Sequence, residues 1–181
     1  MALPLPFSIE KNRTKKKWCL DLGIPEVTVY AFSIENFKRS EEEVNALMDL
    51  AREKFQRLLD EIDTINEWGV RIYVAGRLSL LPEDLQKMVS QAMLATRHNN
   101  KLRLNIAYAY TGRDEISRAV SHIIDGVKNK ELMAEDIDTE LVSQSLDIGE
   151  PELLVRTSGE IRLSDFMLWQ QGHIVVINKP A

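Results

Sequence analysis

The sequence predicts an α/β fold, with a mainly parallel sheet and helices on both faces. Segments rich in β-branched and aromatic residues, typical of strands, alternate with segments in which apolar residues recur every three or four positions, typical of helices. Strands that alternate with helices form parallel sheets joined by right-handed crossovers. The 181 residues contain no internal repeat, low-complexity tract or linker, and they suffice for one domain with a sizeable core.

Five segments have the composition of strands, because Val, Ile, Tyr and Phe fit the pleated, half-buried surface of a sheet. They cover residues 27–32, 70–75, 102–108, 153–155 and 174–177. The fourth segment is a short apolar run, Leu-Leu-Val, that predicts a buried strand. The helical segments lie between these strands.

The first helical segment, residues 15–22, ends at Gly23, which suits the left-handed backbone at a helix C-terminus. A long helix follows Ser40, which forms a capping box with Glu43, and its apolar stripe runs from Val44 to Ile65. Further helices are predicted after Pro82, over residues 114–127 and over about 139–146. The inward face of the helix at 114–127 is predicted to carry Ile116, Ala119, Val120, Ile123, Ile124 and Val127.

The composition argues against several classes of function. The net charge of −5 at pH 7 argues against general nucleic-acid binding, which usually requires a basic face. The single cysteine, Cys19, excludes an intrachain disulfide, fits a reducing compartment and is expected to be a small buried hydrophobe. The histidines have no zinc-type spacing: His98, His122 and His173. No apolar run approaches the roughly 18 residues of a membrane-spanning helix, so a soluble or membrane-peripheral chain is expected.

The loops that follow the predicted strands each contain an arginine. These loops are residues 33–39, 76–77, 110–113 and 156–159. Because ligands bind beyond the carboxyl ends of the strands in parallel sheets, the four loops are predicted to form one anionic-ligand site at a shared edge. In the alternative interpretation, these are ordinary loop arginines that pair with neighbouring carboxylates.

The segment after the fourth strand carries the densest set of candidate binding residues. Arg156 follows the apolar run directly, and Arg162 and Ser164 come soon after it. Two guanidinium groups and several hydroxyls at a strand end can bind a multiply charged oxyanion such as a diphosphate. The alternative is a surface turn in which these arginines pair with nearby acids.

Three motifs resemble the cis-prenyltransferases, the family of undecaprenyl and dehydrodolichyl diphosphate synthases. They are FSIENFKR at 32–39, LNIAYAYTGR at 104–113 and LVRTSGEIRLSDFMLWQ at 154–170, and their wording is most similar to that of eukaryotic members. The resemblance runs from about Trp18 to Gln170. It implies a partial cis-prenyltransferase domain at 18–170, between a divergent N-terminal flank at 1–17 and a divergent C-terminal end at 171–181.

The resemblance implies an activity, a cofactor and partners. Members of the family add isopentenyl diphosphate to an allylic, farnesyl-type diphosphate, with Mg²⁺, to make polyprenyl diphosphate for dolichol. The resemblance also implies a partner, either a homologous second subunit or a second copy of the chain. The implied location is peripheral to the cytoplasmic face of the endoplasmic reticulum, or in the cytoplasm. The growing prenyl chain requires a dry apolar tunnel, and the long helix from Glu41 is the expected wall.

The resemblance also implies roles for seven residues. Ser33 and Asn36 are the expected catalytic residues near the condensing carbons, and Asn36 is expected to help orient the proton that is lost. The diphosphate of isopentenyl diphosphate is expected to be held by Arg156, Arg162 and Ser164. Arg39 and Phe37 are expected to line the substrate site, although Phe37 is equally compatible with the core. No residue is assigned as a metal ligand.

The sequence departs from the family pattern at both ends. The family's Asp-Gly-Asn-Arg loop, which helps to bind Mg²⁺ and the allylic diphosphate, has only a faint counterpart at residues 10–13, with Glu10 for the aspartate and Lys11 for the glycine. The family pattern beyond Gln170 is also absent. A domain truncated at both ends is therefore expected, and the alternative function is a catalytically inactive isoform or fragment that acts as a binding or dimerisation subunit.

Overall fold

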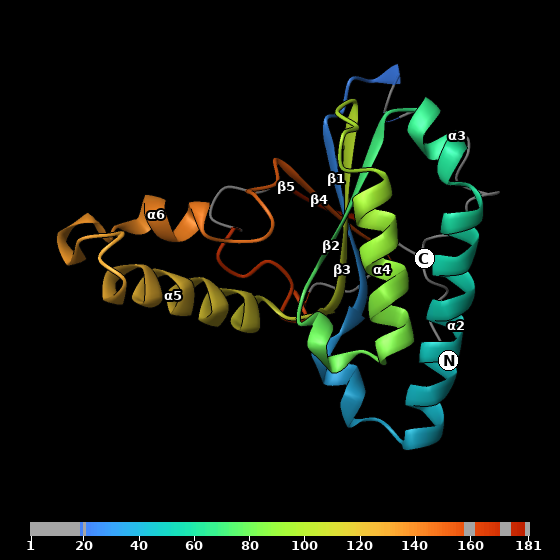
Figure 1. Cartoon of the computed structure of the whole chain (residues 1–181), viewed down its shortest axis with the longest axis horizontal. Helices are drawn as coiled ribbons and strands as arrows, with labels where there is room; N and C mark the ends of the chain where they lie inside the picture. The colour runs from blue at the N-terminus through green and yellow to red at the C-terminus, as the bar shows by residue number, and fades with distance from the viewer. Residues whose placement is uncertain (1–18, 20, 158–161, 171–174, 180–181) are drawn as a thin grey trace. The chain divides into compact units, whose positions relative to one another are not determined.

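The structure, a computed structural model, describes residues 19, 21–157, 162–170 and 175–179, and it divides into two compact units (Figure 1). Unit 1 is Met1–Ala109 and unit 2 is Tyr110–Ala181, so strand β3 crosses the boundary. None of the helices in the described part of the chain is long and apolar enough to span a membrane.

Unit 1 contains a sheet of three strands in the order β1-β3-β2, formed by β1 (Glu26–Ser33), β3 (Leu102–Tyr110) and β2 (Val70–Ala75). β2 and β3 are parallel and pair from Val70↔Leu102 to Ala75↔Ala107. Contacts between β1 and β3 advance in the same direction along both strands. The Pro25 carbonyl accepts from the Arg103 amide at 2.8 Å, Thr28 accepts from Asn105 at 3.1 Å, and Phe32 stacks on Tyr108 at 5.1 Å. The predicted parallel arrangement is therefore confirmed.

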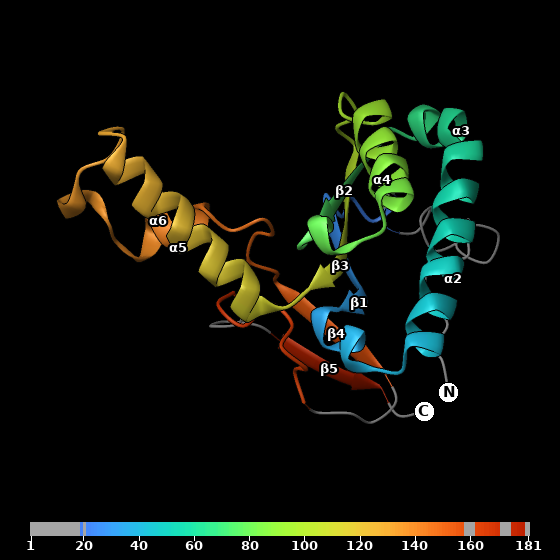
Figure 2. The same ribbon diagram turned by 60° about the horizontal axis from the view of Figure 1, so that its bottom comes forward.

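Three helices pack with this sheet: α2 (Glu41–Asp60), α3 (Ile62–Glu67) and α4 (Glu83–Ala95). α2 lies against α4, while α3 and α4 contact β2 (Figure 2). The Ser40 hydroxyl caps α2 by accepting from the Glu43 amide at 3.3 Å, as predicted. The core between these helices and the sheet is formed by Phe32, Met48, Phe55, Leu58, Ile72, Val74, Leu85, Val89, Leu104, Ile106 and Tyr108, among others.

The prediction of one continuous helix from residue 41 to residue 65 was wrong. The helix breaks at Glu61, whose backbone (φ −101°, ψ 15°) leaves the helical region and ends α2 while starting α3. Ile65 remains buried on α3, so the apolar spacing continues across the break. Apolar periodicity alone does not reveal such a local change of backbone geometry.

Unit 2 contains α5 (Gly112–Lys128), α6 (Thr139–Gln144), and the parallel pair β4 (Leu153–Thr157) and β5 (Val175–Lys179). β4 and β5 form a separate two-stranded sheet, a pairing that the sequence did not predict. The predicted burial of residues 153–155 was wrong for Leu153 and Val155, which are 51% and 57% exposed. An apolar composition favours a strand, but it does not determine how much of the strand is covered or which strand lies beside it.

The inward face of α5 differs from the prediction. Val120 and Ile124 are exposed, and the buried stripe runs through Glu115, Ala119 and Ile123. Ala119 and Ile123 are buried as predicted, and Ile116 and Val127 are partly buried. The prediction was wrong for Val120 and Ile124, because the buried face includes Glu115 in their place. The buried face of α5 thus includes a charged residue, Glu115, in its first turn.

The predicted helix at 15–22 and the flank at 1–17 lie almost entirely outside the described residues. Gly23 has the left-handed backbone expected of a helix C-terminus, with φ 68°, and the Ile24 amide donates to the Cys19 carbonyl at 2.9 Å. Cys19 is partly buried and packs against the core of unit 1.

Candidate functional site

Ser33 and Asn36 are fixed to one another at the carboxyl end of β1. Ser33 caps a 3₁₀ turn, η1 (Ile34–Lys38), because its hydroxyl accepts from the Glu35 amide at 3.2 Å. The Ser33 amide donates to Asn36 Oδ1 at 2.8 Å, which completes a reciprocal capping box. Asn36 Oδ1 therefore serves the cap, and the amide nitrogen is the remaining hydrogen-bonding group of this side chain.

Phe37 and Arg39 follow on the same turn and have different surroundings. Phe37 is partly buried and packs edge-to-face on Phe32, with ring centroids 4.9 Å apart and an interplanar angle of 74°. Arg39 is exposed and forms an ion pair with Glu43 at 3.7 Å. Phe37 thus extends the core, and Arg39 has a carboxylate partner.

The carboxyl ends of β2 and β3 meet at the same edge. Gly76 has φ 135°, and a Cβ there would lie 2.1 Å from the Tyr108 carbonyl oxygen, so only glycine fits. This close approach lets the Arg77 amide donate to the Ala109 carbonyl at 2.9 Å. The ends of β2 and β3 therefore lie side by side, whereas the shared anionic-ligand site of the four loops remains a prediction. Tyr108 is buried beneath this edge, and burial raises the pKa of its hydroxyl.

In unit 2 the structure brings together Arg156 and Ser164, two of the three residues predicted to bind the diphosphate. Arg156 lies near the end of β4, and its Nη2 is 3.4 Å from the Ser164 hydroxyl. Arg162 is exposed. Both Arg162 and Ser164 belong to residues 162–170, which form neither helix nor strand and are called the anchored segment below.

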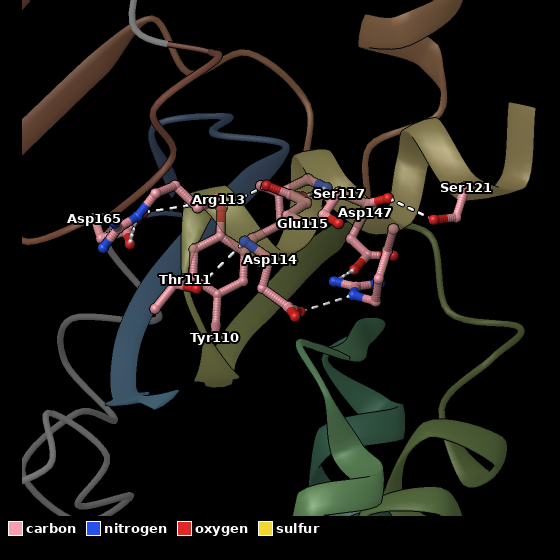
Figure 3. Close-up of polar contacts among 11 residues, drawn as sticks. Tyr110, Thr111, Arg113, Asp114, Glu115, Ser117, Ser121, Asp147 and Asp165 are labelled. Carbon is pink, nitrogen blue, oxygen red and sulfur yellow. Dashed lines mark hydrogen bonds and ion pairs between the residues drawn. The ribbon is translucent and has the colours of Figure 1, made fainter. Parts of the chain in front are cut away.

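The first half of the anchored segment is docked on the N-terminal turn of α5. The Asp165 carboxylate accepts from the Arg113 amide at 3.0 Å and from Arg113 Nε at 2.7 Å, and the Asp165 carbonyl accepts from the Gly112 amide at 2.6 Å (Figure 3). A Cβ at Gly112 would lie 2.9 Å from the Leu168 amide nitrogen, so a side chain there would push the segment away. Arg113, like Arg39, therefore has a carboxylate partner in the structure.

The second half is docked through a buried acid, Glu115, which is only 1% exposed. Its Oε2 accepts from the Tyr110 hydroxyl at 2.5 Å and from Gln170 Nε2 at 2.9 Å. Its Oε1 accepts from the Ile148 amide at 3.0 Å. Three donors thus replace the water that a carboxylate loses on burial.

Sequence reasoning missed the contributions of Glu115, Asp165 and the Gln170 amide. One signal was present, since Glu115 lies four residues before Ala119 and eight before Ile123, on one face of a helix. A charged residue in line with buried apolar positions indicates a buried carboxylate with dedicated partners. Its partner Gln170 is 55 residues away in sequence, and no local pattern indicates that contact.

The described residues do not provide a ready metal site. Among residues 19, 21–157, 162–170 and 175–179, no three His, Cys, Asp or Glu side chains are grouped so as to hold a metal ion. A cage built from protein side chains alone is thus not present among the described residues, whereas Mg²⁺ is usually bound by one or two carboxylates together with substrate phosphates.

The fold and the site define an α/β protein with arginine and serine side chains at the carboxyl end of a parallel strand, an arrangement suited to phosphate groups. Residues 7–179 match the model of the family described as "Putative undecaprenyl diphosphate synthase". The chain belongs to this family of prenyltransferases, as its motifs predicted.

Curated relatives agree with this membership. The chain is 52% identical over 168 residues to the dehydrodolichyl diphosphate synthase complex subunit DHDDS of Homo sapiens. The matched region covers 91% of this chain and 50% of that protein. The chain is 43% identical over 167 residues to the tritrans,polycis-undecaprenyl-diphosphate synthase (geranylgeranyl-diphosphate specific) of Thermococcus kodakarensis, covering 91% and 63%. The chain thus spans only about half to two thirds of the length of these relatives.

Solved structures share the fold. Lavandulyl diphosphate synthase from Lavandula x intermedia, in complex with dimethylallyl diphosphate, superposes with a TM-score of 0.83 at 32% identity, over 91% of this chain and 72% of that one. A probable undecaprenyl diphosphate synthase from Campylobacter jejuni superposes with a TM-score of 0.84 at 26% identity, over 96% and 79%.

Proposed function

We propose that this chain carries the isopentenyl diphosphate-binding part of a cis-prenyltransferase that makes polyprenyl diphosphate for dolichol. The observation that supports this most directly is the pairing of Arg156 with Ser164 beyond β4, on a segment held in place by its own contacts. The family membership and the printed activities of the relatives support the same reaction class.

In the proposed reaction, the allylic carbon–oxygen bond breaks and diphosphate leaves with the electron pair. The π electrons of isopentenyl diphosphate form the new carbon–carbon bond, and loss of one proton creates the new cis double bond. Arg156, Arg162 and Ser164 hold the diphosphate of isopentenyl diphosphate through charge-assisted hydrogen bonds. This fixes the nucleophile in orientation, which is a large part of the catalytic effect for a two-substrate reaction.

Ser33 and Asn36 are proposed to act near the reacting carbons. The capping box supports this assignment, because it holds the Ser33 hydroxyl and the Asn36 side chain in fixed positions at the end of β1. Phe37 and Arg39 remain proposed as substrate-site residues of the same turn. The packing of Phe37 on Phe32 gives it a structural task as well.

The cofactor, partner and location remain part of the proposal. Mg²⁺ suits a diphosphate substrate, since it binds phosphate oxygens and keeps several waters rather than requiring an all-protein cage. A homologous second subunit is supported by the relative named as a complex subunit. A peripheral position at the cytoplasmic face of the endoplasmic reticulum would suit a long lipid product.

The proposal is tested by incorporation of labelled isopentenyl diphosphate onto farnesyl diphosphate, with Mg²⁺, with and without a candidate partner subunit. Arg156→Ala is expected to lower incorporation about a hundredfold, as removal of an oriented donor does. Arg97→Ala is the control, because Arg97 is exposed and its Nε bonds only to the neighbouring His98. No incorporation by folded protein in either arrangement would contradict the proposal and favour the non-catalytic binding subunit.

A further inference from the structure

Glu115 is a buried acid for which the proposed reaction has no task. Its carboxylate joins three parts of unit 2: Tyr110 at the end of β3, Ile148 in the loop before β4, and Gln170 at the end of the anchored segment. Gln170 is itself 2% exposed, and its Nε2 also donates to the Ile148 carbonyl at 3.0 Å. Glu115 and Gln170 therefore form one buried polar cluster that fixes the end of the segment.

The anchored segment needs such contacts because its backbone is intrinsically unfavourable. Ser164, Asp165 and Met167 have left-handed φ angles of 53°, 57° and 49°. Each non-glycine residue in this region costs about 1–2 kcal/mol. The conformation persists only where the surroundings impose it, and strained residues of this kind are concentrated at functional sites.

The contacts that impose this conformation lie at one of the strained residues, Asp165, and beyond the last of them, at Gln170. Asp165 is held by Arg113 and Gly112, and Gln170 is held by Glu115. The indole of Trp169 adds a hydrogen bond to the Ser143 hydroxyl at 2.9 Å. Asp165 and its partner Arg113 are partly solvent-accessible, whereas the Glu115–Gln170 contact is fully buried and hence the better shielded of the two.

The chemistry of the cluster requires an acid at 115 and an amide at 170. Gln170 Nε2 lies between two acceptors, Glu115 Oε2 and the Ile148 carbonyl. If the amide were reversed, its oxygen would face both acceptors. A glutamine at position 115 would likewise present an N–H to one of the three donors that now converge on the carboxylate.

We propose that Glu115 is a positioning residue for the diphosphate site. It holds residues 162–170 through Gln170, so that Ser164 and Arg162 stay in register with Arg156. The consequence for substrate binding rests on the proposed function, in which these three side chains hold isopentenyl diphosphate. The consequence for the segment itself does not.

The first test compares the kinetics of Glu115→Gln with those of Asp114→Asn. Both changes remove one charge from the first turn of α5, and Asp114 forms an ion pair with Arg118 of the same helix at 3.0 Å. Glu115→Gln is expected to raise KM for isopentenyl diphosphate about tenfold to a hundredfold, as a small misplacement of binding groups does, and to leave KM for the allylic diphosphate unchanged. Asp114→Asn is expected to leave both KM values unchanged.

The second test is amide hydrogen exchange without substrate. In Glu115→Gln, amides of residues 164–170 are expected to lose protection, while those of α2 and α4 keep it. Gln170→Met is the second variant should Glu115→Gln not fold. It removes the contact to the segment but leaves Glu115 with its Tyr110 and Ile148 donors, and the same loss of protection is expected.

Gln170→Glu places a carboxylate against both Glu115 and the Ile148 carbonyl, and it is expected to weaken the affinity for isopentenyl diphosphate more than Glu115→Gln does. Unchanged exchange in residues 164–170, or an equal rise of both KM values, would overturn the positioning role. If the wild-type protein binds no isopentenyl diphosphate, the proposed function and the role of Glu115 in diphosphate binding are both overturned. Hydrogen exchange in Glu115→Gln then still decides whether Glu115 holds the anchored segment.

Discussion

Ser164 combines two requirements in one residue: a hydroxyl 3.4 Å from Arg156 and a backbone with φ 53°. The two requirements can be separated by substitution. Threonine keeps the hydroxyl, but β-branched residues are poorly tolerated at positive φ, whereas glycine accepts this backbone freely and lacks the hydroxyl.

We expect Ser164→Thr to lower the free energy of unfolding by about 1–2 kcal/mol. Ser164→Gly should keep or raise the stability and weaken isopentenyl diphosphate binding. Chemical denaturation and equilibrium binding measure the two effects independently. A threonine variant as stable as wild type would show that the left-handed backbone at this position is not needed.

Part of the site was predictable residue by residue. The rule that ligands bind beyond parallel strand ends placed Arg156 and Ser164 together, and the capping preference of serine explains the fixed pair Ser33 and Asn36. Glu115 and Asp165 could not be assigned in this way, because their partners Gln170 and Arg113 are 55 and 52 residues away in sequence. Long-range polar contacts leave no periodic pattern.

Among the secondary-structure elements, α2 and α4 are joined by an ion pair on the surface. Arg52 on α2 donates from Nε to Asp84 on the first turn of α4 at 2.5 Å, and it also pairs with Asp49 at 2.7 Å. The hydrogen bond from Arg52 lowers the pKa of Asp84 below its ordinary value, and backbone amides of the helix N-terminus act in the same direction.

A lowered folded-state pKa makes this contribution dependent on pH. The stabilisation is fully present above the unfolded pKa of about 4 and is lost as the pH falls through the lowered folded value. We expect Arg52→Met to raise the pKa of Asp84 toward its ordinary value, and the stability difference from wild type to vanish at acidic pH. NMR titration of the Asp84 carboxyl carbon measures the first effect, and denaturation over a pH series measures the second.

Arg57→Met is the matched control, because Arg57 lies on the same helix and pairs with Glu53 at 3.9 Å. It should leave the pKa of Asp84 unchanged. If Asp84 titrates identically in wild type and in Arg52→Met, the ion pair seen between α2 and α4 is not populated in solution.

The elements were more predictable than their faces and ends. All five strands follow β-branched and aromatic composition closely, and α5 was expected within a few residues of its bounds. The break at Glu61 and the exposure of Val120 and Ile124 were not predicted. Both depend on backbone geometry and tertiary contacts, which an apolar count does not contain.

The whole chain is acidic, with a net charge of −5, although its proposed ligand is an anion. Any electrostatic attraction for a diphosphate must therefore come from local arginines such as Arg156. Salt screens this attraction beyond a Debye length of about 8–10 Å at physiological ionic strength. The alternation of strands and helices predicted the class of fold, and the net charge argued against general nucleic-acid binding, but only the motif residues indicated the family.

The parallel pairing of β4 with β5 has a consequence for how the protein folds. Parallel strands cannot be joined by a tight hairpin, so β4 and β5 can pair only through a longer connection in the sequence. Closing such a loop loses entropy before the sheet contacts form, which slows folding. In refolding experiments with pulsed hydrogen exchange, we therefore expect the amides of β4 and β5 to become protected after those of α2 and α4. The residues proposed to receive the substrate would then be among the last to reach their native places.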